Sequence, residues 1–172
     1  MAKHTISNRD DVIDSRDIIE WIEDLESEIA AEEISEDNGA NPQLDDDGNT
    51  LVDTVTCGTC GRSWNGALIT SRTPAPGARC PYEGIHEEIK ELASLRAVAD
   101  QGEGYGDWAH GEALIRDSYF VTYAQELADD IGAIDRNAQW PVNHIDWDAA
   151  AEELKVDYTE IDFDGVTYWM RS

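Results

Sequence analysis

The stretch Leu51–Glu88, LVDTVTCGTCGRSWNGALITSRTPAPGARCPYEGIHEE, contains all three cysteines of the chain. Cys57 and Cys60 form a C-x2-C pair with flanking glycines, a turn in which both thiolates can reach one tetrahedral ion. Nineteen residues separate Cys60 from Cys80, and five separate Cys80 from His86. The spacing C-x2-C-x19-C-x5-H therefore predicts a Cys3His zinc site.

The segment between these ligands is rich in glycine, proline, serine and threonine, so it is too polar and too short to bury a core of its own. A metal ion is the natural way to hold it together. Because the protein would fill all four zinc positions, the predicted zinc is structural and has no open position for a catalytic water. Two alternatives remain. The fourth ligand could instead be Asp53, Glu83 or Glu87, or the three thiols could be free, with one of them in a redox pair.

The charge of the chain is strongly negative, with 12 basic and 38 acidic residues and a formal net charge of −26. This balance excludes ordinary nucleic-acid binding over most of the surface. Duplex DNA carries one negative charge per 1.7 Å of axis, so the chain has the charge of about 44 Å of duplex, or about 13 base pairs. The charge predicts either DNA mimicry or, more simply, a protein kept in solution by self-repulsion.

The negative charge is unevenly distributed. The residues between Asp53 and Glu83 include no acid, but they include Arg62, Arg72 and Arg79. Subtracting these three charges from −26 leaves −29 for the rest of the chain. The cysteine segment therefore presents a different surface. This supports an alternative function, an adaptor whose zinc module contacts a nucleic acid or a protein partner through the three arginines.

The rest of the composition indicates in which cellular compartment the protein works. A hydrophobic share of 41% is sufficient for a folded core. The N-terminal residues contain no apolar run of the signal-peptide kind, and no apolar stretch has the length of a membrane span. An odd number of cysteines argues against disulfide bonds. We therefore expect a protein of the reducing cytoplasm, with no membrane partner.

Two amphipathic segments flank the cysteine stretch. Residues 1–14 are expected to form a loose leader, and from Ser15 the run SRDIIEWIEDLESEIAAEEI has the helical spacing of apolar residues, with Ser15 as its N-cap. The run HEEIKELASLRAVAD has the same period. The simplest arrangement is a helical hairpin with arms at 15–50 and 84–100 and an inserted zinc module, 51–88, at its tip.

The C-terminal region, 111–172, is expected to be a small domain after a glycine-rich linker, 101–111. Its pattern predicts one helix over 112–134 that is closed by Gly132, then a short helix capped by Asp146, and finally a β-hairpin turning at Asp164-Gly165. The predicted fold class is α+β and mainly helical.

The chain offers little that suggests catalysis. An enzyme needs a nucleophile, a base and an orienting group, or a metal ion with an open position. His144 lies near Asp146 and Asp148 and could serve as a base, but a histidine near the start of a helix more often has a local hydrogen-bonding role. We therefore expect a protein that is not an enzyme.

The run Leu114–Ser172 resembles the C-terminal part of ArdA-type antirestriction proteins and sequences of actinobacterial phages and mobile elements. The motifs that carry the resemblance are the run YAQEL at 123–127, the pattern IDW at 145–147 with Ala149, Glu153 and Leu154 after it, and the final Asp157-Tyr158 with Phe163-Asp164-Gly165. The cysteine stretch also resembles a small phage-encoded module in which a histidine follows the last cysteine. In place of the two further acidic domains of ArdA proteins, this chain has the predicted hairpin and zinc module.

This resemblance implies a homodimeric DNA mimic that occupies the DNA groove of a type I restriction-modification enzyme in a bacterial host cell, and so evades host defence. Acidic side chains on the outer faces of the helices would stand in for phosphates. The carboxylates that we expect to take this role are Asp17, Glu20, Glu23, Glu26, Glu126, Asp129, Asp130, Glu152 and Glu153.

Overall fold

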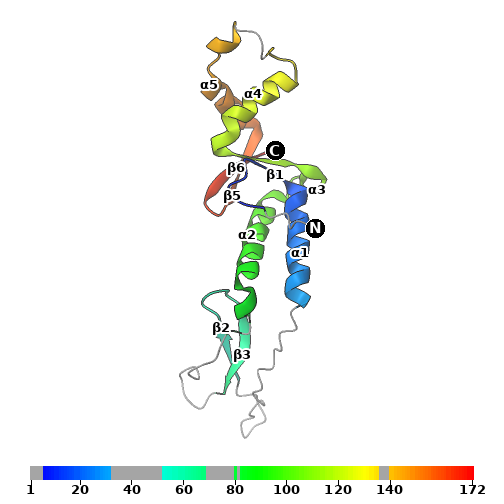
Figure 1. Ribbon diagram of the computed structural model, residues 1–172, viewed down its shortest axis with the longest axis vertical. Helices are drawn as coiled ribbons and strands as arrows, with labels where there is room; N and C mark the ends of the chain where they lie inside the picture. Colours follow the sequence, from blue (N-terminus) through cyan, green and yellow to red (C-terminus); the bar gives the residue numbers. More distant parts are fainter. Residues whose placement is uncertain (1–5, 32–51, 69–79, 81, 136–139) are drawn as a thin grey trace. The chain divides into compact units, whose positions relative to one another are not determined.

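The computed structural model describes residues 6–31, 52–68, 80, 82–135 and 140–172. The chain divides into two compact units, one made of Met1–Asp24 with Ala93–Ser172 and the other of Leu25–Leu92. We call them the sheet unit and the cysteine unit (Figure 1). The fold is α+β and mainly helical, as the sequence predicts. The predicted helical hairpin with the zinc module at its tip describes how the two units are arranged, and it stays a prediction.

The sheet unit is built on a four-stranded antiparallel sheet with the strand order β1-β4-β6-β5. The strands are β1 (Val12–Asp14), β4 (Ala113–Arg116), β5 (Tyr158–Phe163) and β6 (Val166–Arg171). The hairpin of β5 and β6 is confirmed. It turns at Asp164 and Gly165, whose φ angles of 50° and 77° fit the two-residue turn that Asp-Gly favours.

Helices and short 3-10 segments complete the sheet unit. Those that lie wholly within it are α3 (Trp108–Gly111), α4 (Phe120–Asp130), α5 (Trp147–Leu154), η2 (Asp117–Tyr119), η3 (Val142–His144) and η4 (Lys155–Asp157). Two longer helices, α1 (Ser15–Ala31) and α2 (His86–Gly102), have residues in both units. The cysteine unit also contains β2 (Val52–Thr56), β3 (Ser63–Leu68) and η1 (Glu83–Ile85).

Both faces of the central strands are buried. Ile115, on β4, belongs to a cluster with Phe120, Ala124, Ala151 and Tyr158, which joins α4 and α5 to one face of the sheet. The opposite face carries apolar side chains that are also fully buried, namely Leu114, Ile161, Tyr168 and Met170. The sheet unit therefore has a hydrophobic core on both faces of its sheet.

Three sequence predictions are wrong here. Residues 1–14 are not only a leader, because β1 pairs with β4 and both Ile6 and Ile13 are buried. The helix expected over 112–134 begins only at Phe120, because Ala113–Arg116 forms β4. The linker 101–111 contains α3 and a buried Trp108. The sheet unit consequently extends well beyond 111–172.

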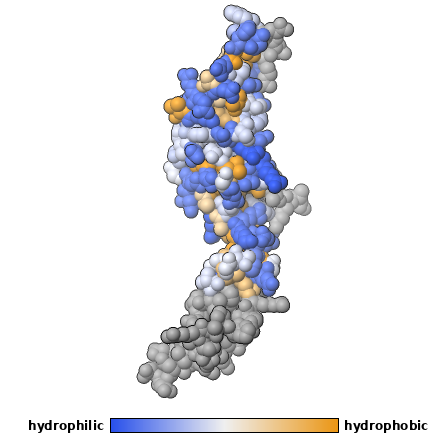
Figure 2. Space-filling view, turned by 90° about the vertical axis from the view of Figure 1, so that its left-hand side faces the viewer, coloured by the Kyte–Doolittle hydropathy of each residue, from blue (hydrophilic) through white to orange (hydrophobic). Residues whose placement is uncertain are grey.

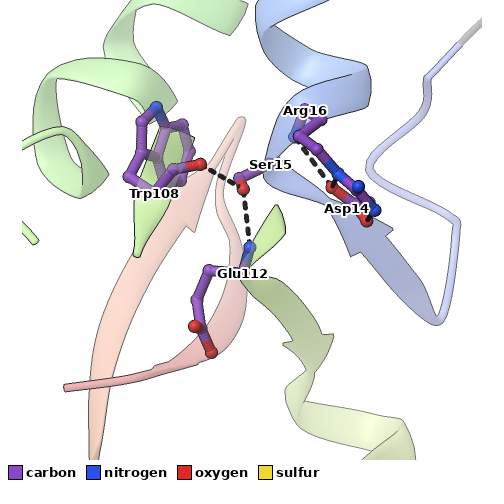
Figure 3. Close-up of polar contacts among 5 residues, drawn as sticks. All are labelled: Asp14, Ser15, Arg16, Trp108 and Glu112. Atoms are coloured by element: carbon purple, nitrogen blue, oxygen red, sulfur yellow. Dashed lines mark hydrogen bonds and ion pairs between the residues drawn. The ribbon is translucent and has the colours of Figure 1, made fainter. Parts of the chain in front are cut away.

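Ser15 shows why the first segment is ordered. Its side chain is fully buried, and Oγ donates to the carbonyl of Trp108 at 2.6 Å while it accepts from the N–H of Glu112 at 2.8 Å (Figure 3). The N–H of Arg16 is instead bound by Asp14, whose carboxylate also accepts from the Arg16 side chain. This pairing holds the pKa of Asp14 below its usual value. The Ser15 side chain thus connects the N-terminal segment to α3. The sequence predicts a different role for it, as the N-cap of α1.

The ends of α4 and α5 follow their sequence signals. Gly132 has a φ of 71° and donates to the carbonyl of Asp129, while Ala133 donates to that of Ala128, which is the Schellman arrangement. Asp146 accepts from the N–H of Ala149 at 3.1 Å and so caps α5. Both predictions are confirmed.

Candidate metal centre

The first half of the cysteine site is a tight turn between β2 and β3. β2 ends at Thr56 and β3 begins at Ser63. Between them the N–H of Cys57 donates to the carbonyl of Arg62 at 2.8 Å, and the N–H of Gly61 donates to the carbonyl of Cys57 at 2.9 Å. Gly61 has a φ of 72°, a conformation that favours glycine. The turn therefore presents Cys57 and Cys60 from one rigid piece of backbone.

The second half comes from the start of α2. The N–H of Glu83 donates to the carbonyl of Cys80 at 3.1 Å, and η1 leads directly into α2, of which His86 is the first residue. The short 3-10 segment thus fixes the path from Cys80 to His86. The histidine ring is positioned by a helix rather than by a free loop.

These elements bring the four predicted ligands together. His86 Nε2 lies 3.2 Å from Cys80 Sγ and 3.7 Å from Cys57 Sγ, and the Cys60 and Cys80 sulfurs are 3.9 Å apart. All four ligand atoms lie within 4.8 Å of one another. Zn–S bonds of about 2.3 Å and Zn–N bonds of about 2.0 Å at tetrahedral angles place two sulfurs about 3.8 Å apart and a sulfur and a nitrogen about 3.5 Å apart. The three separations given above lie close to these values, and the remaining pairs are no more than 4.8 Å apart.

The electrostatics differ between the cysteines. The backbone N–H groups of Cys60 and Thr59 point at Cys57 Sγ and lower the pKa of the Cys57 thiol to about 6. Burial, in contrast, raises the pKa of Cys80 to about 11. The turn itself therefore favours the thiolate form of Cys57, whereas Cys80 favours the protonated form unless a cation is close.

Two of the alternative fourth ligands, Glu83 and Glu87, do not join the cluster. The exposed Glu87 is paired with Lys90 at 2.9 Å, and Glu83 is exposed outside the four-residue group. The side chain of Asp53 lies outside what the structure describes. The three cysteines carry no disulfide bond, and a separation of 3.9 Å between the Cys60 and Cys80 sulfurs is far from the bonded distance of about 2.05 Å. His86 is therefore the fourth member of the site.

One of the three arginines that the adaptor alternative invokes has a partner within the cysteine unit. The Arg62 guanidinium lies 5.2 Å from the centre of the Tyr82 ring, a cation–π contact between the two halves of the module. Arg72 and Arg79 lie outside the described residues. Arg62 therefore contributes a contact within the site itself.

The predicted phosphate-mimicking carboxylates occupy both units. In the described chain, Glu20, Glu23, Glu26, Asp130, Glu152 and Glu153 are exposed, while Asp17, Glu126 and Asp129 are half-buried. Some of the nine also have partners within the protein. Glu126 accepts from the Tyr119 hydroxyl at 2.7 Å, and Glu152 pairs with Lys155 at 2.9 Å. The visible surface is largely hydrophilic, with scattered apolar islands (Figure 2).

Sequence reasoning missed a pocket in the sheet unit. It has a volume of about 160 Å³ and is lined by Thr122, Gln125, Glu126, Ile134, Val142 and Trp147. These residues come from α4, from η3, from the first residue of α5 and from the chain between them. Helical spacing could have placed Thr122, Gln125 and Glu126 on one side of α4, but no local pattern indicates what the rest of the chain brings against them.

No protein-family model, curated protein or solved structure matches this chain. The resemblance to ArdA-type proteins therefore stays a prediction. Among the described residues, no helix combines the length and the apolar character that crossing a membrane requires.

Proposed function

We propose that this chain is a non-enzymatic acidic binding protein, a DNA mimic with antirestriction-like activity, in which a structural zinc ion holds the cysteine unit together. The observation that supports the metal assignment is the convergence of three sulfurs and one imidazole nitrogen within 4.8 Å of one another. The donor set fits zinc, because thiolate and imidazole are its preferred ligands. A closed set of four protein ligands supplies folding energy and leaves no position for a substrate.

The charge supports the mimicry. A net charge of −26 on 172 residues gives a field that repels nucleic acids and attracts basic surfaces. Most of the predicted carboxylates are exposed on helices, where they keep fixed positions along an axis. The partner that fits this surface is the DNA-binding groove of a bacterial DNA-processing protein, such as a type I restriction-modification enzyme. Binding of this kind is electrostatic, so it weakens steeply with salt.

The test is a cleavage assay. DNA cleavage by a type I restriction enzyme is measured at increasing concentrations of the full-length chain, at low and at high salt. Mimicry predicts inhibition that excess duplex DNA relieves and that high salt removes. Reversal of the exposed Glu20, Glu23 and Glu153 to lysine removes three negative charges and adds three positive ones, so it should weaken inhibition by at least about tenfold. Inhibition that is insensitive to both DNA and salt would contradict the proposal.

A second function is favoured by the acid-free stretch between Asp53 and Glu83. In this alternative the zinc module is an adaptor that binds a nucleic acid or protein partner through Arg62, Arg72 and Arg79. Charge reversal of the three arginines separates the two functions. It abolishes partner binding by an adaptor, but it leaves inhibition by a DNA mimic intact.

A further inference from the structure

The pocket in the sheet unit has the chemistry of an anchor site. Its lining combines three apolar side chains, Ile134, Val142 and Trp147, with the polar groups of Thr122, Gln125 and Glu126. Each of the three apolar residues is half-buried, so part of its surface remains open to a ligand. Pockets that bind side chains or small molecules have this composition, an apolar wall with a few polar groups that orient the guest.

The volume limits the guest. A pocket of about 160 Å³ has room for one side chain but not for a cofactor. Apolar cavities of about 150 Å³ accept benzene, so a phenyl ring or a leucine-sized group fits here. The guest is therefore a single aromatic or branched aliphatic side chain.

Exposed apolar residues lie next to the lining residues in the sequence. Ile131, which follows the last residue of α4, is 70% exposed, and Trp140, two residues before Val142, is 77% exposed. Single exposed apolar side chains are ordinary. Here, however, they flank the two chain segments that supply Ile134 and Val142 to the pocket. Exposed apolar side chains therefore lie within three residues of the pocket lining in the sequence.

The charge of the same region indicates which charges a partner would carry beside its apolar side chain. Between Phe120 and Leu154 the sequence has eight acidic residues and one basic residue. Asp130, Asp146 and Asp148 are exposed, and Glu126 lies in the pocket wall itself. An acidic surface alone attracts any cation without orienting it. An apolar pocket within such a surface selects a chain that carries an apolar group between positive charges.

We propose that this pocket binds an aromatic or branched aliphatic side chain from a cationic segment of a partner protein, with the surrounding carboxylates pairing with lysine and arginine on either side. This inference deepens the proposed function and rests on it, because it names the feature of a basic partner that the acidic surface holds most tightly. DNA offers no such anchor. The pocket therefore gives the mimic a preference for its protein target that charge alone does not supply.

The test uses synthetic peptides of known composition as probes. A fluorescent peptide of lysines and arginines around one phenylalanine is titrated with the full-length protein, alongside the same peptide with alanine in place of phenylalanine. A third peptide keeps the phenylalanine but has serines in place of the basic residues. Burial of one phenyl ring predicts that the first peptide binds at least about tenfold more tightly than the second. The third should bind far more weakly than the first.

Two pocket variants locate the site. Thr122→Phe fills the pocket from an exposed position on α4, and Ile134→Ala widens it. Both should reduce the preference for phenylalanine over alanine. Ala93→Phe, at an exposed position of α2 that does not line the pocket, is the matched control and should leave it unchanged. A shift of the Trp147 indole N–H resonance on adding the first peptide gives a readout that does not depend on the variants.

The outcomes separate this inference from the proposed function. Equal binding of the phenylalanine and alanine peptides, unaffected by Thr122→Phe and Ile134→Ala, would overturn the pocket assignment and leave electrostatic mimicry in place. Equal binding of the cationic and serine peptides would overturn the cationic partner. Failure of both cationic peptides to bind at low salt would contradict both proposals.

Discussion

The sheet unit and the cysteine unit stabilise their backbones by different means. In the sheet unit, fully buried Leu114, Ile115, Phe120, Tyr168 and Met170 form a core around four paired strands. In the cysteine unit, buried apolar residues lie on α1 and α2, namely Leu25, Ile29, Ile89 and Leu92, whereas residues 56–62, 80 and 82–88 around the cysteines include none. Instead, three sulfurs and a histidine nitrogen converge there. The comparison teaches that apolar burial accounts for the order of the sheet unit but not for that of the cysteine site, where the proposed zinc ion would take its place.

Metal removal should produce the largest difference between the units. Structural zinc in small domains contributes about 10–16 kcal/mol of apparent binding free energy. We therefore expect a strong chelator, or Cys57→Ser, to disorder the Cys57–Gly61 turn while the β5–β6 hairpin stays folded. Two-dimensional NMR of the backbone amides reports both units in one spectrum.

Glu83→Gln is the matched control for that experiment, because Glu83 is an alternative ligand that lies outside the cluster. It should leave the zinc content and the spectrum unchanged. Simultaneous collapse of the sheet-unit resonances on chelation would break the comparison, since it would make the sheet unit dependent on the metal as well.

A core truncation should have the opposite selectivity. Phe120 is fully buried and packs against Tyr158, Tyr123 and Trp169, with ring centres 5.1, 5.6 and 6.2 Å away. Phe120→Ala should lower the free energy of unfolding of the sheet unit by about 3–5 kcal/mol, because it removes apolar contact and leaves a cavity. Urea unfolding measures the loss. The zinc content per chain should remain that of the parent protein, and its loss would contradict the independence of the two units.

How much of each unit can be predicted from the sequence depends on how far apart in the chain the interacting residues lie. Cys57, Cys60, Cys80 and His86 could be predicted, because ligand type and spacing are encoded locally. The hairpin turn at Asp164-Gly165, the cap at Asp146 and the Gly132 ending were local as well. The strands β1 and β4 could not be predicted. A three- or four-residue apolar run has no decisive period, and β1 is ordered by pairing with residues about a hundred positions away.

The edge of the sheet allows a finer test. The Gln101 side chain donates to the carbonyl of Asp162 at 3.0 Å and accepts from the N–H of Asp162 at 2.9 Å, so it covers part of the β5 edge. Gln101→Ala removes these two bonds and a third, from the Gln101 side chain to the carbonyl of Ala97 at 2.7 Å, and should lower the free energy of unfolding of the sheet unit by about 1–2 kcal/mol. It should also expose strand edge that can pair with another chain.

Thermal unfolding and light scattering measure the two effects of Gln101→Ala. Gln101→Glu is the conservative control, because it retains an acceptor for the Asp162 N–H while it loses the donor to the carbonyl. An unchanged midpoint for Gln101→Ala would show that the glutamine does not contribute to the edge.

The smallest expected effect is a pH dependence that is confined to the sheet unit. Hydrogen bonds from Lys155 at 2.8 Å and from the Trp169 indole at 2.7 Å lower the pKa of Asp117. Since the folded pKa lies below the unfolded value of about 3.9, the stabilisation is complete above that value and is lost as the pH falls through the folded pKa. The Asp117 side chain is 52% exposed, so solvent screening limits its contribution to under about 1 kcal/mol.

Asp117→Asn should reduce the slope of stability against pH below about pH 4, where the parent protein titrates this group. Chemical unfolding at a series of pH values checks it. A steeper slope in the variant would reverse the sign and contradict the assignment of the Lys155 contact.

The central claim is that Cys57, Cys60, Cys80 and His86 bind one zinc ion with no position left open. X-ray absorption spectroscopy of the purified full-length protein, with zinc content measured on the same sample, tests it most directly. We expect one zinc per chain, with three sulfurs at about 2.3 Å and one nitrogen at about 2.0 Å. A protein without zinc, or a zinc shell that includes a water oxygen in place of the histidine nitrogen, would contradict the account.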